Sequence, residues 1–321
     1  LFSVVIPNWN GAHHLPTCLD ALRAQTHPTV EVIVVDNASG DGSQELIARD
    51  YPEVRVIALP ENRGFTGACN AGMEAAQGEF ISLLNNDTEA DANWVAEVIA
   101  AFGRHPEVGL VATKMMLFAK RDQFHNAGDL YRVDGRLVNR GVWETDTGQY
   151  DTEEYVFSAC GGASTYRRTM LDDIGLLDDD FFFSAEDMDL AWRANMTGYR
   201  CLYAPRAVVY HHLAATGGGE TASFYDGRNM IWLMIKDYPI ELWRKYWPKI
   251  VRAQFALAIE ALRAWRGAAA RARLRGMLAS VTGIRKMLRK RRGIQADRRV
   301  SLETIESILT PVPRKTPGGQ A

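Results

Sequence analysis

The chain has 321 residues, of which 47% are hydrophobic and 24% are charged, so its composition is that of a globular protein with ample apolar side chains for a core. Its four cysteines are scattered and form no CxxC pair, which excludes a disulfide framework and a cysteine-based zinc site and suits a reducing cytosol. No apolar run approaches the roughly 18–20 residues that a bilayer-spanning helix needs. No signal-peptide pattern is visible, and the start at Leu1 leaves open whether a leader was removed.

The net charge of −2 hides an asymmetry along the chain. Residues 1–240 hold 18 Lys and Arg against 34 Asp and Glu, whereas residues 241–300 hold 17 against 3. The sequence therefore predicts an acidic body that carries a basic extension.

The first part of the chain alternates between strand and helix patterns. Runs rich in β-branched residues predict buried strands at 2–7, 30–37, 54–60 and 78–87, and helical patterns separate them at 14–25, 42–50 and 66–77. Strands that recur after helices predict βαβ units and a parallel sheet. The fold class that follows is α/β, with a mostly parallel, Rossmann-like sheet flanked by helices.

The next part of the chain is mixed. A helix at 92–102 and a strand at 109–115 are followed by a hairpin at 131–143, which turns at Asp134-Gly135. Helices are predicted at 167–174 and 186–196, and a strand at 207–211.

Polar residues follow four of the predicted strands. They are Asn8 and Asn10 after the first, Asp36 at the end of the second, Asn62 and Gly64 after the third, and Asn85, Asn86 and Asp87 at the end of the fourth. Turn chemistry is the simpler explanation for each group taken singly. Ligands of open parallel sheets bind beyond the carboxyl ends of the strands, so four such groups together predict a pocket. We also expect that Asp36 can be removed without harm to the fold, because it lies at a strand end rather than within the core.

A nicotinamide cofactor fits this edge poorly. The first βα turn, PNWNGAHH, has no GxGxxG, and no GxxxxGK[ST] occurs in the chain, so the usual phosphate cradles are missing. A bound diphosphate would then need a divalent metal held by oxygen ligands, and Asp87 is the obvious ligand.

Six motifs carry a more specific signal. VVIPNWNG, VDNASGDGS, ENRGFTGACNAG, LLNNDTE, FFFSAEDMDLAWRANMTGYR and AVVYHH occur in this order. The set resembles the family-two glycosyltransferases of the GT-A fold, and most closely the bacterial rhamnosyltransferase-like branch that builds surface polysaccharides. The resemblance covers roughly residues 2–234. It implies a catalytic domain at 1–234, with a GT-A-like sandwich that uses a nucleotide-diphospho-sugar.

The resemblance implies roles at the donor site. Pro7, Asn8 and Asn10 lie where the family has its loop beside the nucleoside, and Asp36 where an acid meets a pyrimidine base. Asn62 and Gly64 resemble the turn near base and ribose. Gly161 and Gly162 resemble the segment near the donor sugar, although a tight bend explains two glycines almost as well.

The resemblance also implies a metal site for Mg²⁺ or Mn²⁺. Asn85-Asn86-Asp87 stands where the family has its DxD motif, so Asn85 replaces the first acid and Asp87 keeps the metal-binding position. His211 resembles a late histidine that completes metal binding. His212 is the alternative, and the alternation of side chains along a strand allows only one of the two to point inward.

Acids cluster at the start of the helix predicted at 186–196. The helix dipole favours Glu186, Asp187 and Asp189 there, which is the simpler explanation. The resemblance instead implies that Asp187 is the general base that deprotonates the acceptor hydroxyl, with Glu186 beside it and Asp189 in support. Arg193 is interpreted as a structural residue or a neighbour of the phosphates.

The basic extension, residues 235–300, is predicted to be helical and amphipathic. Aromatic and aliphatic residues recur at helical spacing among Lys and Arg, a pattern typical of an interfacial helix on anionic lipid. A helical cap packed on the catalytic domain explains the apolar stripe equally well. Nucleic acid fits less well because the body is acidic. Residues 301–321 are predicted to be a largely disordered tail.

The function that follows is a metal-assisted, inverting glycosyltransferase. Its acceptor is expected to be a saccharide, free or linked to a polyprenyl carrier, and its place the cytoplasm, at the inner face of the cell membrane. One alternative is a sugar nucleotidyltransferase, which would carry a Gly-rich basic loop that PNWNGAHH lacks. Another is a non-catalytic sugar- or lipid-binding protein on the same fold, which the Asn85 substitution leaves open.

Overall fold

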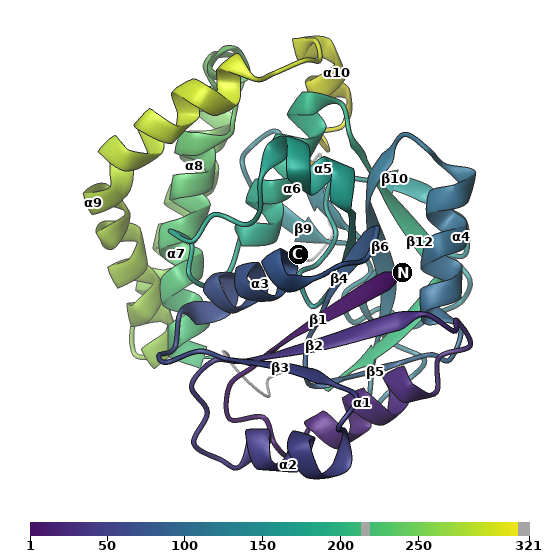
Figure 1. The fold of residues 1–321 in the computed structure, drawn as a ribbon. Coiled ribbons are helices and arrows are strands. Elements are labelled where there is room, and N and C mark those ends of the chain that lie inside the picture. The colour runs from purple at the N-terminus through teal and green to yellow at the C-terminus, as the bar shows by residue number, and fades with distance from the viewer. Residues whose placement is uncertain (213–218, 314–321) are drawn as a thin grey trace.

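A central sheet of ten strands organises the computed structural model, which describes residues 1–212 and 219–313 (Figure 1). Its main path runs in the order β10-β12-β6-β11-β4-β1-β2-β3. The strands are β1 (Phe2–Asn8), β2 (Val30–Asp36), β3 (Arg55–Ala58), β4 (Phe80–Leu84), β6 (Val108–Leu117), β10 (Glu154–Val156), β11 (Ala163–Arg167) and β12 (Arg200–His211). Short strands β5 (Thr88–Ala90) and β7 (Phe124–Asn126) pair with β12 and β6, and β8 (Asp129–Tyr131) and β9 (Leu137–Asn139) form the predicted hairpin.

The sheet is mostly parallel, which confirms the prediction. β1 to β4 run in parallel, as do β6 and β12, whereas β11 is antiparallel to both β4 and β6. β12 begins at Arg200, seven residues before the predicted strand at 207. The register of its ladder with β6 shifts between Ala204 and Val208, around Pro205. Because proline has no N–H to donate to a ladder, the sequence predicted a strand only after Pro205.

Helices cover both faces of the sheet. One face carries α1 (Leu15–Arg23), α2 (Ser43–Asp50) and α4 (Trp94–Arg104), and the other carries α3 (Gly64–Ala75), α5 (Arg168–Ile174) and α6 (Glu186–Thr197). Each face therefore has its own hydrophobic core. In β1, Val4 and Ile6 pack in the core of the first face and Val5 packs in the core of the second, because side chains alternate along a strand.

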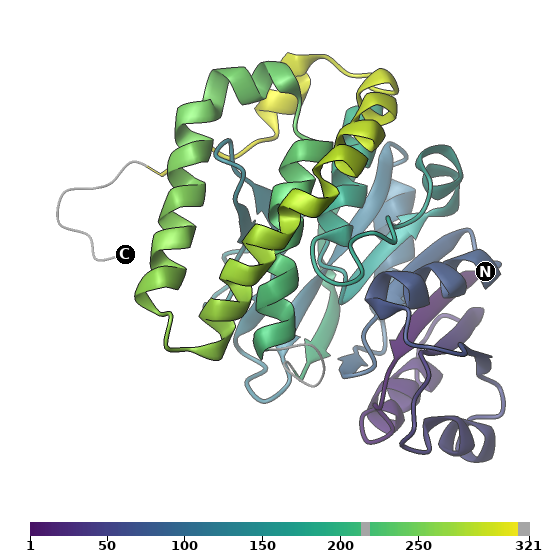
Figure 2. The same ribbon diagram turned by 90° about the vertical axis from the view of Figure 1, so that its left-hand side faces the viewer.

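Four further helices build a third core on the outer side of α6. They are α7 (Gly219–Lys236), α8 (Ile240–Arg263), α9 (Ala268–Ala296) and α10 (Leu302–Ser307), and Figure 2 shows α9 lying across α7, with α8 diverging from it on the same flank. None of the helices within 1–212 and 219–313 is long and apolar enough to cross a membrane. The boundary predicted at residue 234 falls inside α7, and α7 packs along α9.

The tail prediction is wrong for residues 301–313. α10 lies there, with Ser301 as its cap and with Ile305 and Leu309 buried. Thr310 N donates to the Tyr131 carbonyl oxygen at 2.8 Å. The prediction extended the Pro- and Gly-rich composition of residues 311–321 to residues 301–310, where Ile305 and Leu309 are spaced as on one face of a helix. Residues 314–321 lie outside the described residues.

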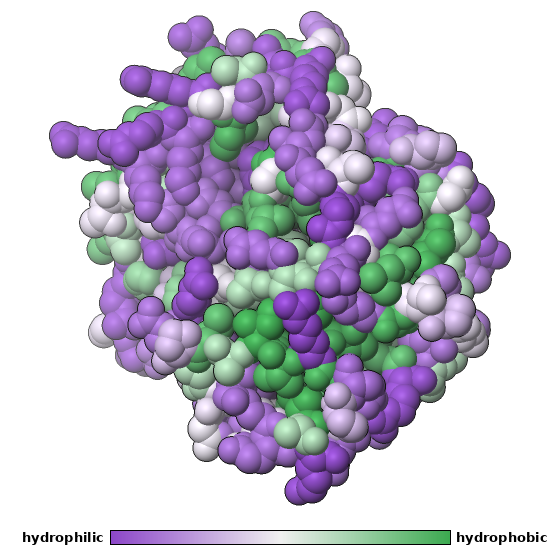
Figure 3. Space-filling model, viewed as in Figure 1, coloured by the Kyte–Doolittle hydropathy of each residue, from purple (hydrophilic) through white to green (hydrophobic). Residues whose placement is uncertain are grey.

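The basic extension packs on the body with one side of its charges. On α9, Lys290 pairs with Asp178 at 2.5 Å and with Asp180 at 2.7 Å, and Lys286 also pairs with Asp180. The interpretation of the extension as a helical cap packed on the catalytic domain therefore holds for the face of α9 that carries Lys286 and Lys290. The outer surface of α9 is hydrophilic (upper left of Figure 3), and Arg285, Arg289 and Arg292 are exposed.

Glycines bring the backbones of α7 and α9 into contact. A Cβ on Gly276 would lie 1.9 Å from the Phe224 carbonyl oxygen, and a Cβ on Gly227 would lie 2.4 Å from the Arg273 carbonyl oxygen. Neither position has room for a side chain unless the helices separate.

We predict that Gly276→Ala lowers the free energy of unfolding by at least about 1–3 kcal/mol, the usual cost of overpacking. Gly293→Ala is the matched control, because it lies in the same helix and a Cβ there meets nothing within 4 Å. That change should be neutral or stabilise by up to about 1 kcal/mol through helix propensity. Urea unfolding measures both, and equal effects of the two substitutions would contradict the close packing of α7 and α9.

Candidate functional site

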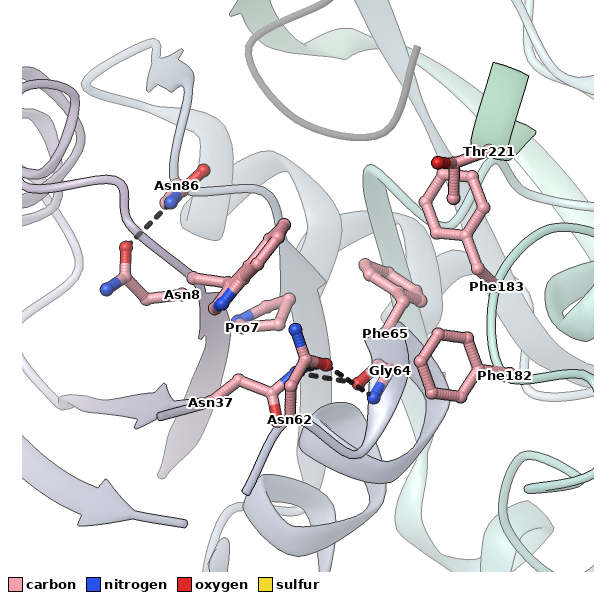
Figure 4. Close-up of a pocket in the computed structure, with 11 residues that line it drawn as sticks. Pro7, Asn8, Asn37, Asn62, Gly64, Phe65, Asn86, Phe182, Phe183 and Thr221 are labelled. Atoms are coloured by element: carbon pink, nitrogen blue, oxygen red, sulfur yellow. Dashed lines mark hydrogen bonds between the residues drawn. The ribbon is translucent and has the colours of Figure 1, made fainter. Parts of the chain in front are cut away.

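A small cavity opens at the carboxyl ends of β1 and β2 (Figure 4). Its volume is about 120 Å³, and it is lined by Pro7, Asn8, Trp9, Asn37, Asn62, Gly64, Phe65, Asn86, Phe182, Phe183 and Thr221. Five of the predicted donor-site residues lie here together: Pro7, Asn8, Asn62, Gly64 and Asn86. Trp9, Asn37 and Phe65 belong to the same strand-end segments but were not predicted as site residues, and no sequence signal pointed to Thr221.

Asn37 holds one wall of the cavity. Its Nδ2 donates to Asn62 Oδ1 and to the Gly64 carbonyl oxygen, both at 3.0 Å, and Gly64 N donates to Asn62 Oδ1 at 2.9 Å. Gly64 has φ of +73°, and a Cβ there would lie 2.5 Å from the Phe182 carbonyl oxygen. The predicted turn at Asn62–Gly64 therefore requires glycine for both its conformation and its contact with the 182–185 loop.

Asp36 lies behind the cavity rather than in it. The side chain is fully buried, so the expectation that it lies outside the core is wrong. Its carboxylate accepts hydrogen bonds from Asn8 Nδ2 (3.1 Å), Ser39 N (3.2 Å) and Gln44 Nε2 (2.8 Å). Strand-end position alone did not reveal these partners. Asn10 is exposed and joins the same loops, because its Oδ1 accepts from Gly40 N at 2.9 Å.

The end of β4 meets the end of β12. Asp87 Oδ1 lies 3.0 Å from His211 Nε2, and Asn85 Nδ2 lies 3.4 Å from the same nitrogen. Asp87 and His211 are both buried. The His212 ring instead stacks on Phe118 with the ring centroids 3.6 Å apart, so His211 is the histidine that faces Asp87.

The environment keeps Asp87 charged. Burial alone would raise the pKa of this carboxyl, but the hydrogen bond and charge of His211, with His14 nearby, outweigh burial and hold the pKa below its usual value. His125 stands behind His211, and their Nδ1 atoms are 3.1 Å apart. Burial and the neighbouring His211 lower the pKa of His125 to about 3, so it is neutral. Sequence reasoning missed His125, which is distant in the chain and belongs to no motif.

The acids that start α6 differ in their surroundings. Asp187 Oδ2 accepts from Gly161 N at 2.8 Å, and Oδ1 accepts from Met188 N at 2.7 Å. Glu186 is buried, and its Oε2 has no hydrogen-bond partner in the described part of the chain. Burial raises the pKa of both Glu186 and Asp187. Asp189 is instead paired with Lys236 and, at 3.0 Å, with Arg193, which makes Arg193 structural.

The loop before these acids is strained. Phe182, Ser184 and Ala185 have φ values of 63°, 69° and 68°, which side-chain-bearing residues seldom adopt. Such strain gathers at functional sites, where surrounding contacts hold it.

Gly161 and Gly162 connect the two acidic groups. A Cβ on Gly161 would lie 3.4 Å from both Asp187 Oδ2 and Glu186 Oε1, and a Cβ on Gly162 would lie 3.2 Å from Asn85 Nδ2. Asn85 N also donates to the Gly162 carbonyl oxygen at 2.9 Å. All the predicted site residues thus fall into one continuous region along the carboxyl edge of the sheet, with Asp36 and Asn10 behind its first loops.

Two groups of side chains are candidates for a metal ion. Asp129, Cys160 and Asp187 place one potential ligand atom each within 4.8 Å of one another. Burial raises the pKa of the Cys160 thiol far above its usual value and that of Asp129 to about 7, and a protonated thiol is a poor ligand for Mg²⁺ or Mn²⁺. Asp87 and His211 offer a charged oxygen and a nitrogen at one strand edge, with the Asn85 amide beside them, which suits such an ion better.

Comparison with known proteins identifies the family. A family model described as glycosyl transferase family 2 matches residues 3–175, more than half of the chain. The chain belongs to this family. The family is one of glycosyl transferases, so the comparison gives no support to the nucleotidyltransferase alternative.

Two curated relatives illustrate the family's range. The chain is 26% identical over 241 residues to N-acetylglucosaminyl-diphospho-decaprenol L-rhamnosyltransferase of Mycobacterium tuberculosis, covering 68% of this chain and 78% of that protein. It is 22% identical to poly-beta-1,6-N-acetyl-D-glucosamine synthase of Staphylococcus epidermidis, covering 80% of this chain and 59% of the synthase.

Solved structures share the GT-A fold. GalNAc-T7 with UDP, GalNAc and Mn²⁺ aligns with a TM-score of 0.62 at 15% identity, over 91% of this glycosyltransferase and 54% of that chain. A mannosyltransferase of Pyrobaculum calidifontis with GDP-Man and Mn²⁺ aligns with a TM-score of 0.53 at 18% identity, over 92% of this chain and 85% of that chain. These likenesses confirm the predicted fold.

We predict that Asp36→Ala destabilises the protein, contrary to the first expectation, and also weakens nucleoside binding. It would leave three donors without this acceptor. A buried unpaired group costs about 1–3 kcal/mol, and this cost applies to Asn8, which is buried, rather than to Gln44, which is exposed. Asn8, which lines the cavity, would lose its support. Urea unfolding and calorimetry with nucleoside diphosphates measure the two effects. Glu45→Ala, an exposed acid on the neighbouring α2, is the control and should change stability by less than about 0.5 kcal/mol. A fully stable Asp36→Ala protein would contradict the role given to its hydrogen bonds.

Proposed function

We propose that this glycosyltransferase is inverting and metal-dependent, and that it moves a sugar from a nucleotide-diphospho-sugar to a saccharide or lipid-linked saccharide in surface polysaccharide biosynthesis. One observation carries the proposal. Two carboxylates at the same sheet edge have opposite environments: the pKa of Asp87 is lowered beside His211, and the pKa of Asp187 is raised by burial beside Gly161. A charged metal ligand and a proton acceptor are what such a transfer requires.

The donor is proposed to bind between the cavity and Asp87. The cavity of about 120 Å³ is smaller than the roughly 300 Å³ or more of a typical small-molecule pocket, so we assign it to the nucleoside end alone. Asn8 and Asn86 join the two places, because Asn86 Nδ2 donates to Asn8 Oδ1 at 2.7 Å. The structural neighbours, which are complexes with UDP or GDP-Man and Mn²⁺, support this class of donor.

Asp87 and His211, with the amide of Asn85, are proposed to hold Mg²⁺ or Mn²⁺. When bound, the ion would neutralise charge on the departing diphosphate. The fit rests on the buried Asp87 carboxylate, which His211 keeps ionised, and on His125, which fixes the His211 ring from behind.

Asp187 is proposed as the general base. Inversion needs a single displacement and one base: Asp187 takes the proton of the acceptor hydroxyl, the acceptor oxygen bonds to the anomeric carbon, and the bond from that carbon to the diphosphate breaks. The N–H groups of Gly161 and Met188 hold the carboxylate in place. Glu186, buried and with a raised pKa, is proposed to stay protonated beside it.

The acceptor and the location rest on the relatives and on the basic extension. A diphospho-decaprenol acceptor is named for the mycobacterial relative, which supports a lipid-linked saccharide. The exposed Arg285, Arg289 and Arg292 support contact with an anionic membrane surface at the cytoplasmic side.

We predict that Asp87→Ala and Asp187→Asn separate binding from chemistry. Asp87→Ala should abolish metal-stimulated donor binding and turnover. Asp187→Asn should keep donor and metal binding but lower the transfer rate by roughly 10²–10⁴-fold, because an amide accepts no proton. Calorimetry with nucleotide-sugars, with and without Mn²⁺, and a sugar-transfer assay provide the two readouts.

Asp122→Ala and Asp172→Asn, both at exposed acids, are the matched controls for these two variants and should behave as the parent protein. Transfer at the parent rate by Asp187→Asn would remove Asp187 as the base. Metal-dependent donor binding by Asp87→Ala would remove the proposed metal site. A parent protein that neither hydrolyses nor transfers any nucleotide-sugar would favour the non-catalytic alternative.

The raised pKa of Asp187 predicts the pH dependence of the reaction. Only the ionised form accepts a proton, so the active fraction should fall as the pH drops through a pKa above the ordinary value of about 4. We therefore expect kcat/KM, measured at saturating metal, to rise with pH through a midpoint above the ordinary carboxyl pKa of about 4. A midpoint at or below about pH 4 would contradict the raised pKa.

A further inference from the structure

An apolar groove lies between the C-terminal helices. Side chains of α7, α8 and α9 line this cavity of about 460 Å³, among them Ile235, Trp243, Phe255 and Leu288. Phe255 is 66% exposed and Leu288 is 47% exposed, so two large apolar side chains of the groove are open to water. Exposed apolar patches of this kind mark interaction sites.

A polar cavity adjoins the groove. Its volume is about 320 Å³, and Gln254 lines both spaces. Ser184 and Ala185, which directly precede Glu186, line the polar cavity. Asn139 also lines it and donates to Asp129 Oδ1 at 2.9 Å, and Asp129 belongs to the cluster with Asp187. The polar cavity therefore lies beside residues that flank the candidate base, and it shares Gln254 with the groove.

Two arginines give the polar cavity its chemistry. Arg136 pairs with no carboxylate in the described ranges; it donates to the Ala253 carbonyl oxygen at 3.1 Å, and its buried Nε has no partner there. Among the residues that the structure describes, Arg273 has only a loose pair, with Asp226 at 3.7 Å. Guanidinium groups in such surroundings suit the oxygens of a phosphate or diphosphate.

We propose that the two cavities bind the lipid-linked acceptor, with its diphosphate between Arg136 and Arg273 and the first isoprene units of its chain in the apolar groove. The inference rests on the proposed function and deepens it. In such an acceptor the order is lipid, diphosphate, sugar, and the order of the spaces along the protein is apolar groove, polar cavity, Asp187. The saccharide next to the diphosphate thus reaches the base while the chain stays on α8 and α9.

Two other occupants, a second copy of the chain or a flat membrane surface, would explain fewer of these features than the lipid-linked acceptor does. Either explains the exposed apolar residues, but neither explains a polar cavity that lies beside Ser184 and Ala185 and holds an arginine with no acidic partner in the described part of the chain. Closeness to the candidate base and charge complementarity to a diphosphate favour the lipid-linked acceptor.

The test uses farnesyl diphosphate as the probe, with EDTA present so that the metal site is empty. Calorimetry on the full chain should show binding at least ten-fold tighter than that of farnesol or of inorganic diphosphate. Phe255→Asp should weaken farnesyl diphosphate at least ten-fold and leave inorganic diphosphate unchanged, whereas Arg136→Gln should weaken both. Phe255→Leu and Trp143→Asp, the latter at an exposed aromatic outside the groove, should match the parent.

Equal binding of farnesyl diphosphate by the parent and by Phe255→Asp would overturn the inference. So would loss of binding in Asp87→Ala, which would place the probe at the donor site. A dimer or vesicle binding that Phe255→Asp abolishes, without any binding of farnesyl diphosphate, would assign the groove to a second copy or to a membrane. Nucleotide-sugar binding with Mn²⁺ is measured on the same proteins. If it persists while farnesyl diphosphate fails to bind, only this inference falls and the proposed function stands.

Discussion

A buried lysine fixes the helix on which the candidate chemistry depends. Lys236, at the end of α7, pairs with Asp189 in α6 and, at 2.6 Å, with Asp178 in the loop before α6. Removing one partner of a buried ion pair leaves an uncompensated charge and costs about 3–5 kcal/mol. The pairing therefore ties the C-terminal helices to α6, and with it sets where Asp187 stands. The extension is part of the architecture of the site rather than an appendage to it.

The same contact separates acids that look equivalent in the sequence. Burial alone would raise the pKa of Asp189, but Lys236 and Arg193 outweigh burial and lower it. Glu186 and Asp187, one helical turn or less away, face no such cation within residues 1–212 and 219–313, and burial raises the pKa of each. Ion pairing with Lys236 and Arg193 thus makes Asp189 a structural acid, while the two acids nearer Gly161 keep the protonation behaviour that a proton-transfer site requires.

Strand ends and order of motifs were predictable, whereas side-chain partners were not. Buried β-branched runs gave β1, β2 and β4, and parallel strands bring their polar ends to one edge by necessity, so Asn8, Asn86 and Asp87 fell together as expected. Asp36 shows the limit: Ser39 and Gln44 cover it, and the sequence does not reveal how their loop folds back. His125 contacts His211 only because β7 lies against β6, which pairs with β12; a strand of three residues leaves little pattern to read. The packing of α7 on α9 likewise depends on glycines whose role is visible only once both backbones are placed.

The charge asymmetry of the chain has two physical meanings, and helical geometry separates them. Within one run of α9, Lys286 and Lys290 are four residues apart and so share a helical face, and both pair with the acidic loop that holds Asp178 and Asp180. Arg285, Arg289 and Arg292 share a different, exposed face. The inward face offsets part of the negative charge of the body and holds the cap in place. Because the first face is occupied by protein contacts, salt should weaken any membrane attraction, which rests on the second face, well before it loosens the partly buried pairs of the first.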